Sequence, residues 1–101
     1  MQVQFHPAAL AELDADAEFY QGRASGLGHT FIDAVEAAAA FLGVHPHAGR
    51  PLSGSAAGLR RWSVRRYPYG LIYVVQDQRV LVLAVAHAKR DPVYWLARVP
   101  E

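Results

Sequence analysis

Residues 80–95 read VLVLAVAHAKRDPVYW and join an unbroken apolar run to a dense group of polar and aromatic residues. The apolar run at 80–86 is too short to cross a bilayer and is typical of a buried β-strand. Histidine, lysine, arginine, tyrosine and tryptophan follow directly at the end of that strand. Such a group either caps the strand or forms a binding surface, so the strand end is the first candidate for a functional site.

The whole chain has the composition of one folded domain, residues 1–101. It is 52% hydrophobic and contains no internal repeat, which gives enough apolar material for a single core. The absence of cysteine excludes disulfides, thiol catalysis and cysteine-based zinc sites, and it fits a reducing cytoplasm. Because no secretory signal pattern opens the chain, we expect a soluble cytoplasmic protein without a membrane span.

Charge is distributed unevenly along the chain. Residues 1–49 contain six acids and one basic residue, Arg23, which gives a net charge of −5. Residues 50–101 contain nine basic residues and three acids, which gives +6. The two halves either form two faces with different partners, one of them anionic, or neutralise each other within the fold.

The first half of the chain predicts a short strand followed by two helices. The alternation in residues 2–5 indicates a strand, which Pro7 ends because it lacks an amide donor. Apolar residues then recur at helical spacing over residues 8–21 and again over 27–42. Gly43 suits a left-handed cap at the end of the second helix. A link of about five residues predicts an antiparallel helical hairpin.

The second half predicts a loop and then a sheet. Residues 43–58 are rich in glycine and proline and indicate a long surface loop. Three strand-like runs follow, at 59–67, 69–76 and 79–86, and the last two are close enough to form a hairpin. Asp91 and Pro92 then suit the start of a short helix through Arg98. The order β-α-α-β-β-β predicts an α+β domain, with a helical hairpin packed on a mostly antiparallel sheet.

Several patterns that often mark active sites are weak in this chain. His45 and His47 lie two residues apart in a loop without further ligands nearby, so we expect no metal site. The glycine-rich segments lack the order and the lysine of a phosphate loop, so we expect no cofactor. The acids of the first helix are interpreted as a solvated face. They do not suggest a catalytic carboxylate pair, because neighbours at i and i+2 point apart.

His87 and the arginines carry more weight. A neutral imidazole at the end of a buried strand can accept or relay a proton at cellular pH. Alternatively, His87 hydrogen-bonds the adjacent turn, and both interpretations stay open. Strand alternation over residues 60–67 places Arg61 and Arg65 on one face with Ser63.

A row of guanidinium groups on this strand can bind phosphates or carboxylates, and nearby tyrosines can stack on bases. Three tyrosines lie in or beside this strand: Tyr67, Tyr69 and Tyr73. The alternative is an edge strand that charge protects from aggregation. We favour a binding surface, because the basic residues after the last strand should reach the same end of the sheet.

Short segments in a fixed order connect this chain to a known group of proteins. They are HPAAL at 6–10, GLGHTF at 26–31, HP at 45–46, GRP at 49–51, LRR at 59–61, RYPY at 66–69, IY at 72–73, AVAH at 84–87 and RDPVYW at 90–95. On these segments the chain resembles the RelE/ParE superfamily of toxins from bacterial type II toxin–antitoxin systems, and it is closer to the ParE branch. The resemblance covers nearly the whole chain and agrees with the predicted order of elements.

The resemblance implies a growth-inhibiting toxin that a cognate antitoxin neutralises by wrapping its C-terminal segment around it. A homodimer or a heterotetramer with the antitoxin is compatible with this. ParE-like members of the superfamily poison DNA gyrase, are linked to plasmid stabilization and are not known as hydrolases. RelE-like members cut messenger RNA in the ribosomal A site.

Individual positions favour the ParE-like function. RelE-like ribonucleases usually carry basic residues where this chain has Ser63 and Gly70, whereas the long hairpin and the Pro-x-Tyr-Trp ending are typical of ParE. The resemblance therefore favours a gyrase inhibitor that is not an enzyme. The surface expected to bind the target comprises Arg61, Arg65, His87, Lys89, Arg90, Tyr94 and Trp95.

Two alternatives remain open. In a ribosome-dependent endoribonuclease, the catalytic residues would be Arg61, His87, Arg90 and Tyr94. A degenerate toxin would bind only its antitoxin.

Overall fold

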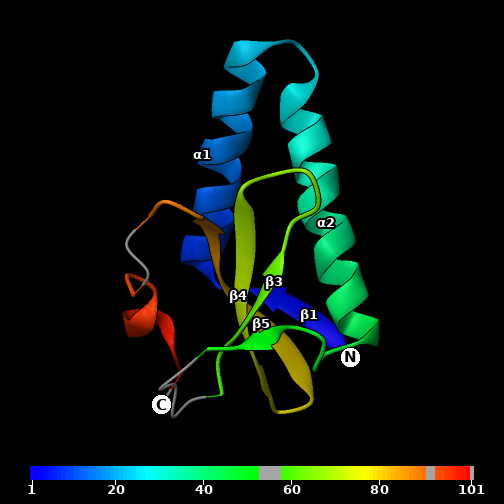
Figure 1. Cartoon of the computed structure of the whole chain (residues 1–101), viewed down its shortest axis with the longest axis vertical. Coiled ribbons are helices and arrows are strands. Elements are labelled where there is room, and N and C mark those ends of the chain that lie inside the picture. The colour runs from blue at the N-terminus through cyan, green and yellow to red at the C-terminus, as the bar shows by residue number, and fades with distance from the viewer. Residues whose placement is uncertain (53–57, 91–92, 101) are drawn as a thin grey trace.

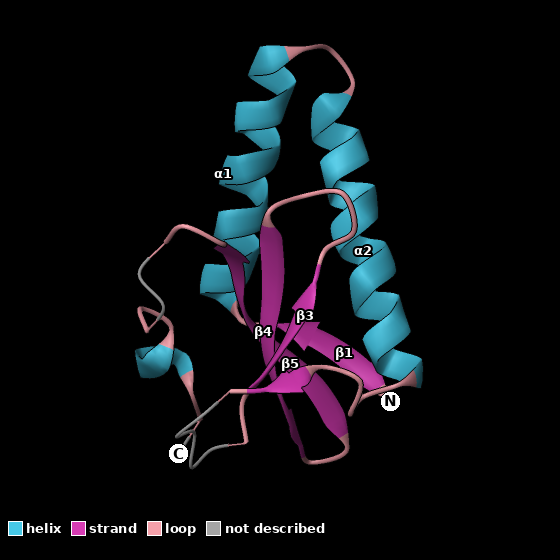
Figure 2. Cartoon of the chain, viewed as in Figure 1, coloured by secondary structure: helices cyan, strands magenta, loops and turns pink. Residues whose placement is uncertain are grey.

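The computed structural model describes residues 1–52, 58–90 and 93–100. Within these residues, two long helices pack on a five-stranded mixed sheet (Figures 1 and 2). The order along the chain is β1, α1, α2, β2, β3, β4, β5 and a short 3₁₀ helix, η1 (Leu96–Arg98). The predicted α+β fold is therefore confirmed.

The helices α1 (Pro7–Arg23) and α2 (Leu27–Val44) form the predicted antiparallel hairpin, which extends beyond the sheet (Figure 1). His6 caps α1, because its Nδ1 accepts a hydrogen bond from the Ala8 amide at 3.0 Å. Between the helices Gly26 adopts φ 89°, a left-handed conformation that favours glycine. The hairpin therefore has defined signals at its start and at its turn.

The end of α2 differs from the prediction. The helix continues through Gly43 to Val44, so the expected left-handed cap at Gly43 is wrong. A Cβ at residue 43 would lie 3.0 Å from the Met1 carbonyl oxygen and 3.2 Å from the Val3 side chain. The glycine is therefore explained by the close approach of the first strand to the helix.

The sheet has the order β1-β5-β4-β3-β2. Its strands are β1 (Gln2–Phe5), β2 (Arg50–Pro51), β3 (Arg60–Ser63), β4 (Tyr69–Gln76) and β5 (Arg79–His87). β1 lies parallel to β5, and the other neighbours are antiparallel. Asp77 and Gln78 join β4 to β5 with φ values of 53° and 57°, as in a type I′ turn. The predicted hairpin between the last two strands is confirmed.

The strand predicted over residues 59–67 is much shorter in the structure. It ends at Ser63, and a turn follows in which the Tyr67 amide donates to the Val64 carbonyl at 3.2 Å. Arg66 has φ 73°, which is incompatible with extended backbone. Face alternation therefore stops before Arg65, and the predicted single row of arginines is wrong.

Two apolar clusters lie on the two faces of the sheet. The helix face, covered by α1 and α2, includes Phe31, Leu71 and Tyr73, each fully buried. The back face carries the second cluster: Leu59, Ile72, Val74, Leu81, Leu83, Ala84, Ala86 and Trp95. The C-terminal segment, drawn in orange and red in Figure 1, packs against this second cluster through Tyr94 and Val99.

By length and composition alone, α2 is apolar enough to cross a membrane. In this structure Phe31 and Leu42 of α2 are fully buried in the helix-face cluster, whereas Phe41 is 41% exposed. Packing in the core therefore accounts for part of its apolar character.

Candidate functional site

The segments that carry most of the predicted basic residues meet at one end of the sheet. β4 and β5 pair from Tyr69 opposite His87, and just beyond this pair the Ala88 amide donates to the Pro68 carbonyl at 2.8 Å. The turn after β3 and the segment after β5 therefore lie close together. This part of the sequence prediction is confirmed.

Glu12 on α1 binds the basic residues that follow β5. Its Oε1 lies 2.8 Å from Nη1 of Arg98, and its Oε2 lies 3.5 Å from Nη1 of Arg90. The same carboxylate accepts the Val85 amide at 3.1 Å, while Arg98 donates to the Leu83 carbonyl at 2.9 Å. These bonds satisfy backbone groups on the half of β5 that β1 does not cover. Arg90 is therefore an ion-paired residue as well as a candidate contact.

Tyr94 and Trp95 pack inward. The Arg90 guanidinium lies 4.0 Å from the centre of the Tyr94 ring, in cation–π geometry. Burial first, and then the Glu12 carboxylate, raise the pKa of Tyr94 well above its ordinary value. Trp95 is only 7% exposed. Trp95 is therefore buried and not available at the predicted target surface in this structure, whereas Tyr94 is half-buried.

His87 hydrogen-bonds the turn that follows it. Its Nδ1 accepts the Lys89 amide at 3.0 Å, and its ring lies edge-on to Tyr69 with centroids 5.0 Å apart. An imidazole that accepts at Nδ1 carries its proton on Nε2 when it is neutral. The other ring nitrogen is then a donor, so His87 is poorly arranged to act as a general base. Of the two interpretations, the structure favours the hydrogen-bonded turn.

Asp16 faces the sheet one helical turn beyond Glu12. Burial raises the pKa of Asp16, and its hydrogen bond with the Tyr69 hydroxyl lowers it in part. The solvated-face interpretation holds for Asp14 and Glu18, which are exposed, and is wrong for Glu12 and Asp16. The i, i+4 spacing puts Glu12 and Asp16 on the same face of α1. The sequence prediction considered only acids at i and i+2, which point apart, and so missed this pair.

We expect Asp16→Asn to flatten part of the pH dependence of stability. Because burial raises the folded pKa above 3.8, the folded chain binds this proton more tightly than the unfolded chain. This contribution to stability is complete below the unfolded pKa and is lost as pH rises through the folded pKa. Asparagine can still accept from Tyr69 and carries no charge, so the variant should be at least as stable at neutral pH.

Urea unfolding across this pH window measures the effect of Asp16→Asn. Asp14→Asn, on the exposed face of the same helix, is the matched control. An unchanged pH profile in Asp16→Asn would contradict the assignment.

Arg61 has a different neighbour from the one predicted. Its cross-strand partner on β2 is Arg50, whose positive charge adds to the effect of burial in lowering the pKa of Arg61. Arg61 donates to Ser63 Oγ at 3.2 Å, and its guanidinium occupies the space that a side chain at Gly70 would need. Because Arg61 lies opposite Ile72 in the register, it projects from the back face. The family resemblance grouped Arg61 with Arg90 as candidate catalytic residues, whereas in the structure Arg61 lies opposite Arg50.

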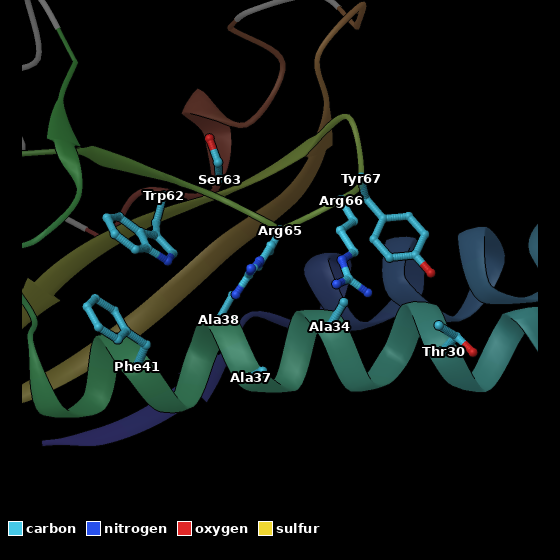
Figure 3. Close-up of a pocket in the computed structure, with 10 residues that line it drawn as sticks. All are labelled: Thr30, Ala34, Ala37, Ala38, Phe41, Trp62, Ser63, Arg65, Arg66 and Tyr67. Carbon is cyan, nitrogen blue, oxygen red and sulfur yellow. The ribbon is translucent and has the colours of Figure 1, made fainter.

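A groove of about 910 Å³ lies between α2 and the turn after β3 (Figure 3). It is lined by Thr30, Ala34, Ala37, Ala38, Phe41, Trp62, Ser63, Arg65, Arg66 and Tyr67. Trp62 stacks on Phe41 at one end, with ring centroids 4.9 Å apart and planes at 8°. Arg65 and Arg66 extend from the turn toward the alanines of α2 in Figure 3. The groove therefore combines an apolar wall with two basic side chains.

Two of the three tyrosines expected to stack beside the arginines belong to the core. Tyr69 is 6% exposed and Tyr73 is 0% exposed. The Tyr73 hydroxyl donates to the Pro46 carbonyl at 2.8 Å and accepts the Gly49 amide at 2.9 Å. The stacking prediction is wrong for these two, and Tyr67 alone lines the groove.

Glu12, Asp16, Arg50 and Phe41 were not predicted as site residues. The lack of acids between Glu36 and Asp77 is a sequence signal that points to Arg50. The helix acids give no comparable signal, because their partners are distant in the sequence. Across residues 1–52, 58–90 and 93–100, no three histidine, aspartate or glutamate side chains are grouped as a metal site requires.

Comparison with known proteins identifies the family. The family model described as ParE toxin of type II toxin-antitoxin system, parDE, matches residues 3–92. The chain belongs to the ParE toxin family. The resemblance seen in the sequence is thereby confirmed for the family and for its role as a type II toxin.

One solved structure has a similar fold. It is described as the chromosomal ParDE TA system from P. aeruginosa, with a TM-score of 0.65 and 21% sequence identity. The alignment covers 86% of this chain and 95% of that chain. None of the curated proteins matches the chain.

Proposed function

We propose that this ParE-family toxin inhibits DNA gyrase in the cytoplasm and that a cognate antitoxin neutralises it. The observation that carries the choice of target is the state of the residues a ribonuclease would need. Arg90 is held by Glu12, Tyr94 is partly buried beside that carboxylate, and His87 accepts from its own turn. These residues are engaged in holding the end of β5.

The chemistry of RNA cleavage supports the same choice. Attack by a 2′-hydroxyl needs a general base, a general acid and cations that stabilise the charged transition state. Because its pKa is raised, Tyr94 keeps its proton and cannot readily act as a general base. The accepting nitrogen of His87, Nδ1, is already bonded to the Lys89 amide. Of the two arginines that match the ribonuclease pattern, Arg90 is ion-paired with Glu12, and only Arg61 makes no salt bridge within the described residues. The ribonuclease is therefore the second candidate.

The groove beside α2 supports the antitoxin part of the proposal. Phe41 lies at the apolar end of the groove and is 41% exposed, although it is a large side chain that folding normally buries. Arg65 and Arg66 make no ion pair with the acids of the described residues. An amphipathic segment with apolar anchors and acidic residues matches both features. Such a segment can be disordered until it binds.

Expression without antitoxin tests the proposal. We expect growth to stop, and we expect Arg65→Ala to relieve the arrest, because its exposed guanidinium lies at the predicted target surface. Such a surface substitution should change stability by no more than about 0.5 kcal/mol. Colony counts after induction measure toxicity, with Arg23→Ala at the far end of α1 as a control for loss of charge.

Co-purification with the product of the adjacent small gene tests the partner. Absence of both growth arrest and binding would remove support for an active toxin with an antitoxin. Binding without arrest would support the degenerate toxin instead.

A further inference from the structure

We propose that Arg50, Arg61 and Ser63 form an oxyanion site on the back face of the sheet that takes a phosphate group. The site lies where β2 meets β3, away from the groove beside α2. It adds a binding function to this toxin and does not depend on gyrase being the target.

No salt bridge neutralises the positive charge at this site within residues 1–52, 58–90 and 93–100. Residues 37–76 contain five arginines and no aspartate or glutamate. Glu12 pairs with Arg90 and Arg98, and it is the only acid that forms a salt bridge within the described residues. Two guanidinium groups facing each other across a strand pair repel, and like charges directly opposite are destabilising. A bound anion would offset this repulsion and so stabilise the two arginines in the folded chain.

The geometry provides a place for that anion. Arg50 lies opposite Arg61 in the β2–β3 register. Together with Ser63 they line a hollow of about 280 Å³, which Ala48 and Trp62 complete. Gly70 on the adjacent strand leaves room for the Arg61 guanidinium, which donates to Ser63 Oγ. The hydroxyl and the guanidinium are therefore held near the same hollow before any ligand arrives.

The donor set matches a phosphate better than a carboxylate. A single guanidinium already satisfies both oxygens of a carboxylate with two parallel hydrogen bonds. Here two guanidinium groups and a hydroxyl line one hollow and offer donors from separate strand positions. A phosphate presents more oxygens in a tetrahedral arrangement and can accept from all three residues. An acidic peptide is thus the less suitable ligand.

The phosphate could be free or carried on a nucleic-acid backbone, and direct binding distinguishes these sources. The first probe is a short labelled DNA duplex, whose binding is measured by fluorescence anisotropy over a range of salt concentrations. The second probe is inorganic phosphate, whose binding is measured by NMR chemical shift changes of the protein. The variants are Arg50→Gln and Arg61→Gln. Arg23→Gln, at the end of α1, removes the same charge away from the site and is the control.

We expect each site variant to weaken DNA binding about tenfold and to reduce the salt slope by about 1, as loss of one phosphate contact does. Arg23→Gln should leave both quantities nearly unchanged. Binding of inorganic phosphate alone, with the same dependence on Arg50 and Arg61, supports the site and assigns a free phosphate. Arg50→Gln decides the outcome if Arg61→Gln does not fold, because Arg50 is exposed on an edge strand.

Equal losses in the two site variants and in Arg23→Gln would overturn the proposal. So would binding of a polyglutamate peptide that depends on both arginines when neither phosphate probe binds. If the wild-type toxin binds phosphate but does not inhibit gyrase, the proposed target is wrong and the phosphate site is still supported.

Discussion

Replacing Ala37 with tryptophan is expected to abolish neutralisation by the antitoxin. Ala37 is exposed and lines the groove between α2 and the turn after β3. An indole at this position would fill space that the partner's apolar anchors need. We expect a loss of affinity of about 100-fold, which corresponds to about 2.7 kcal/mol. Titration of the purified variant with antitoxin measures the affinity, and growth during co-expression shows the consequence.

The helix offers a matched control. Ala40 is also exposed on α2, but it is not among the residues that line the groove. Ala40→Trp makes the same change in helix propensity and surface area, so it should bind antitoxin like the wild type. If both variants are neutralised equally, the antitoxin does not use this groove.

The second large effect is expected from Glu12→Ala. The Glu12 side chain is 10% exposed, and its loss would leave Arg98 without its ion pair and the Val85 amide without its acceptor. Removing one partner of a largely buried ion pair costs about 3 kcal/mol or more, because the other charge remains in place. Urea unfolding should show this loss as a lower midpoint with a similar slope.

Glu18→Ala is the control for this measurement, because Glu18 is exposed on the same helix. Its free energy of unfolding should stay within about 0.5 kcal/mol of the wild type. A Glu12→Ala variant as stable as Glu18→Ala would show that the carboxylate does not hold the C-terminal segment to β5.

The parts of the fold that depend on local patterns were predictable from the sequence. Helical spacing and the short link predicted the hairpin of α1 and α2. Apolar, strand-like runs and the short Asp77-Gln78 link predicted β4, β5 and the hairpin between them. These elements depend on neighbours close in the sequence, and the structure agrees with each of them.

The errors come from contacts between distant residues and from one turn that begins several residues before its proline, Pro68. Arg66 adopts a positive φ although arginine gives no turn signal, so the strand seemed to continue to residue 67. The predicted helix start at Asp91 and Pro92 lies outside the described residues, and the described helical part is Leu96–Arg98 alone. Glu12 pairs with Arg98 across most of the chain, and no local pattern can indicate such a contact.

The candidate site was predicted in composition but not in arrangement. The basic residues do gather at one end of the sheet. However, the structure divides them into an ion-paired group around Glu12, a hollow that Arg61 lines and a groove that Arg65 lines. Arg50 joins Arg61 through β2, a strand of two residues inside a loop rich in glycine and proline. A strand so short leaves no periodic signal in the sequence.

We propose that this ParE-family toxin acts on gyrase and not on messenger RNA. The direct measurement runs two assays on one purified preparation: supercoiling by DNA gyrase, and cleavage of messenger RNA on translating ribosomes. A double variant, His87→Ala with Tyr94→Phe, runs alongside to detect any proton transfer by these residues. We predict inhibited supercoiling or trapped cleaved DNA, with messenger RNA intact. A-site cleavage that disappears in the double variant, with gyrase unaffected, would contradict the account.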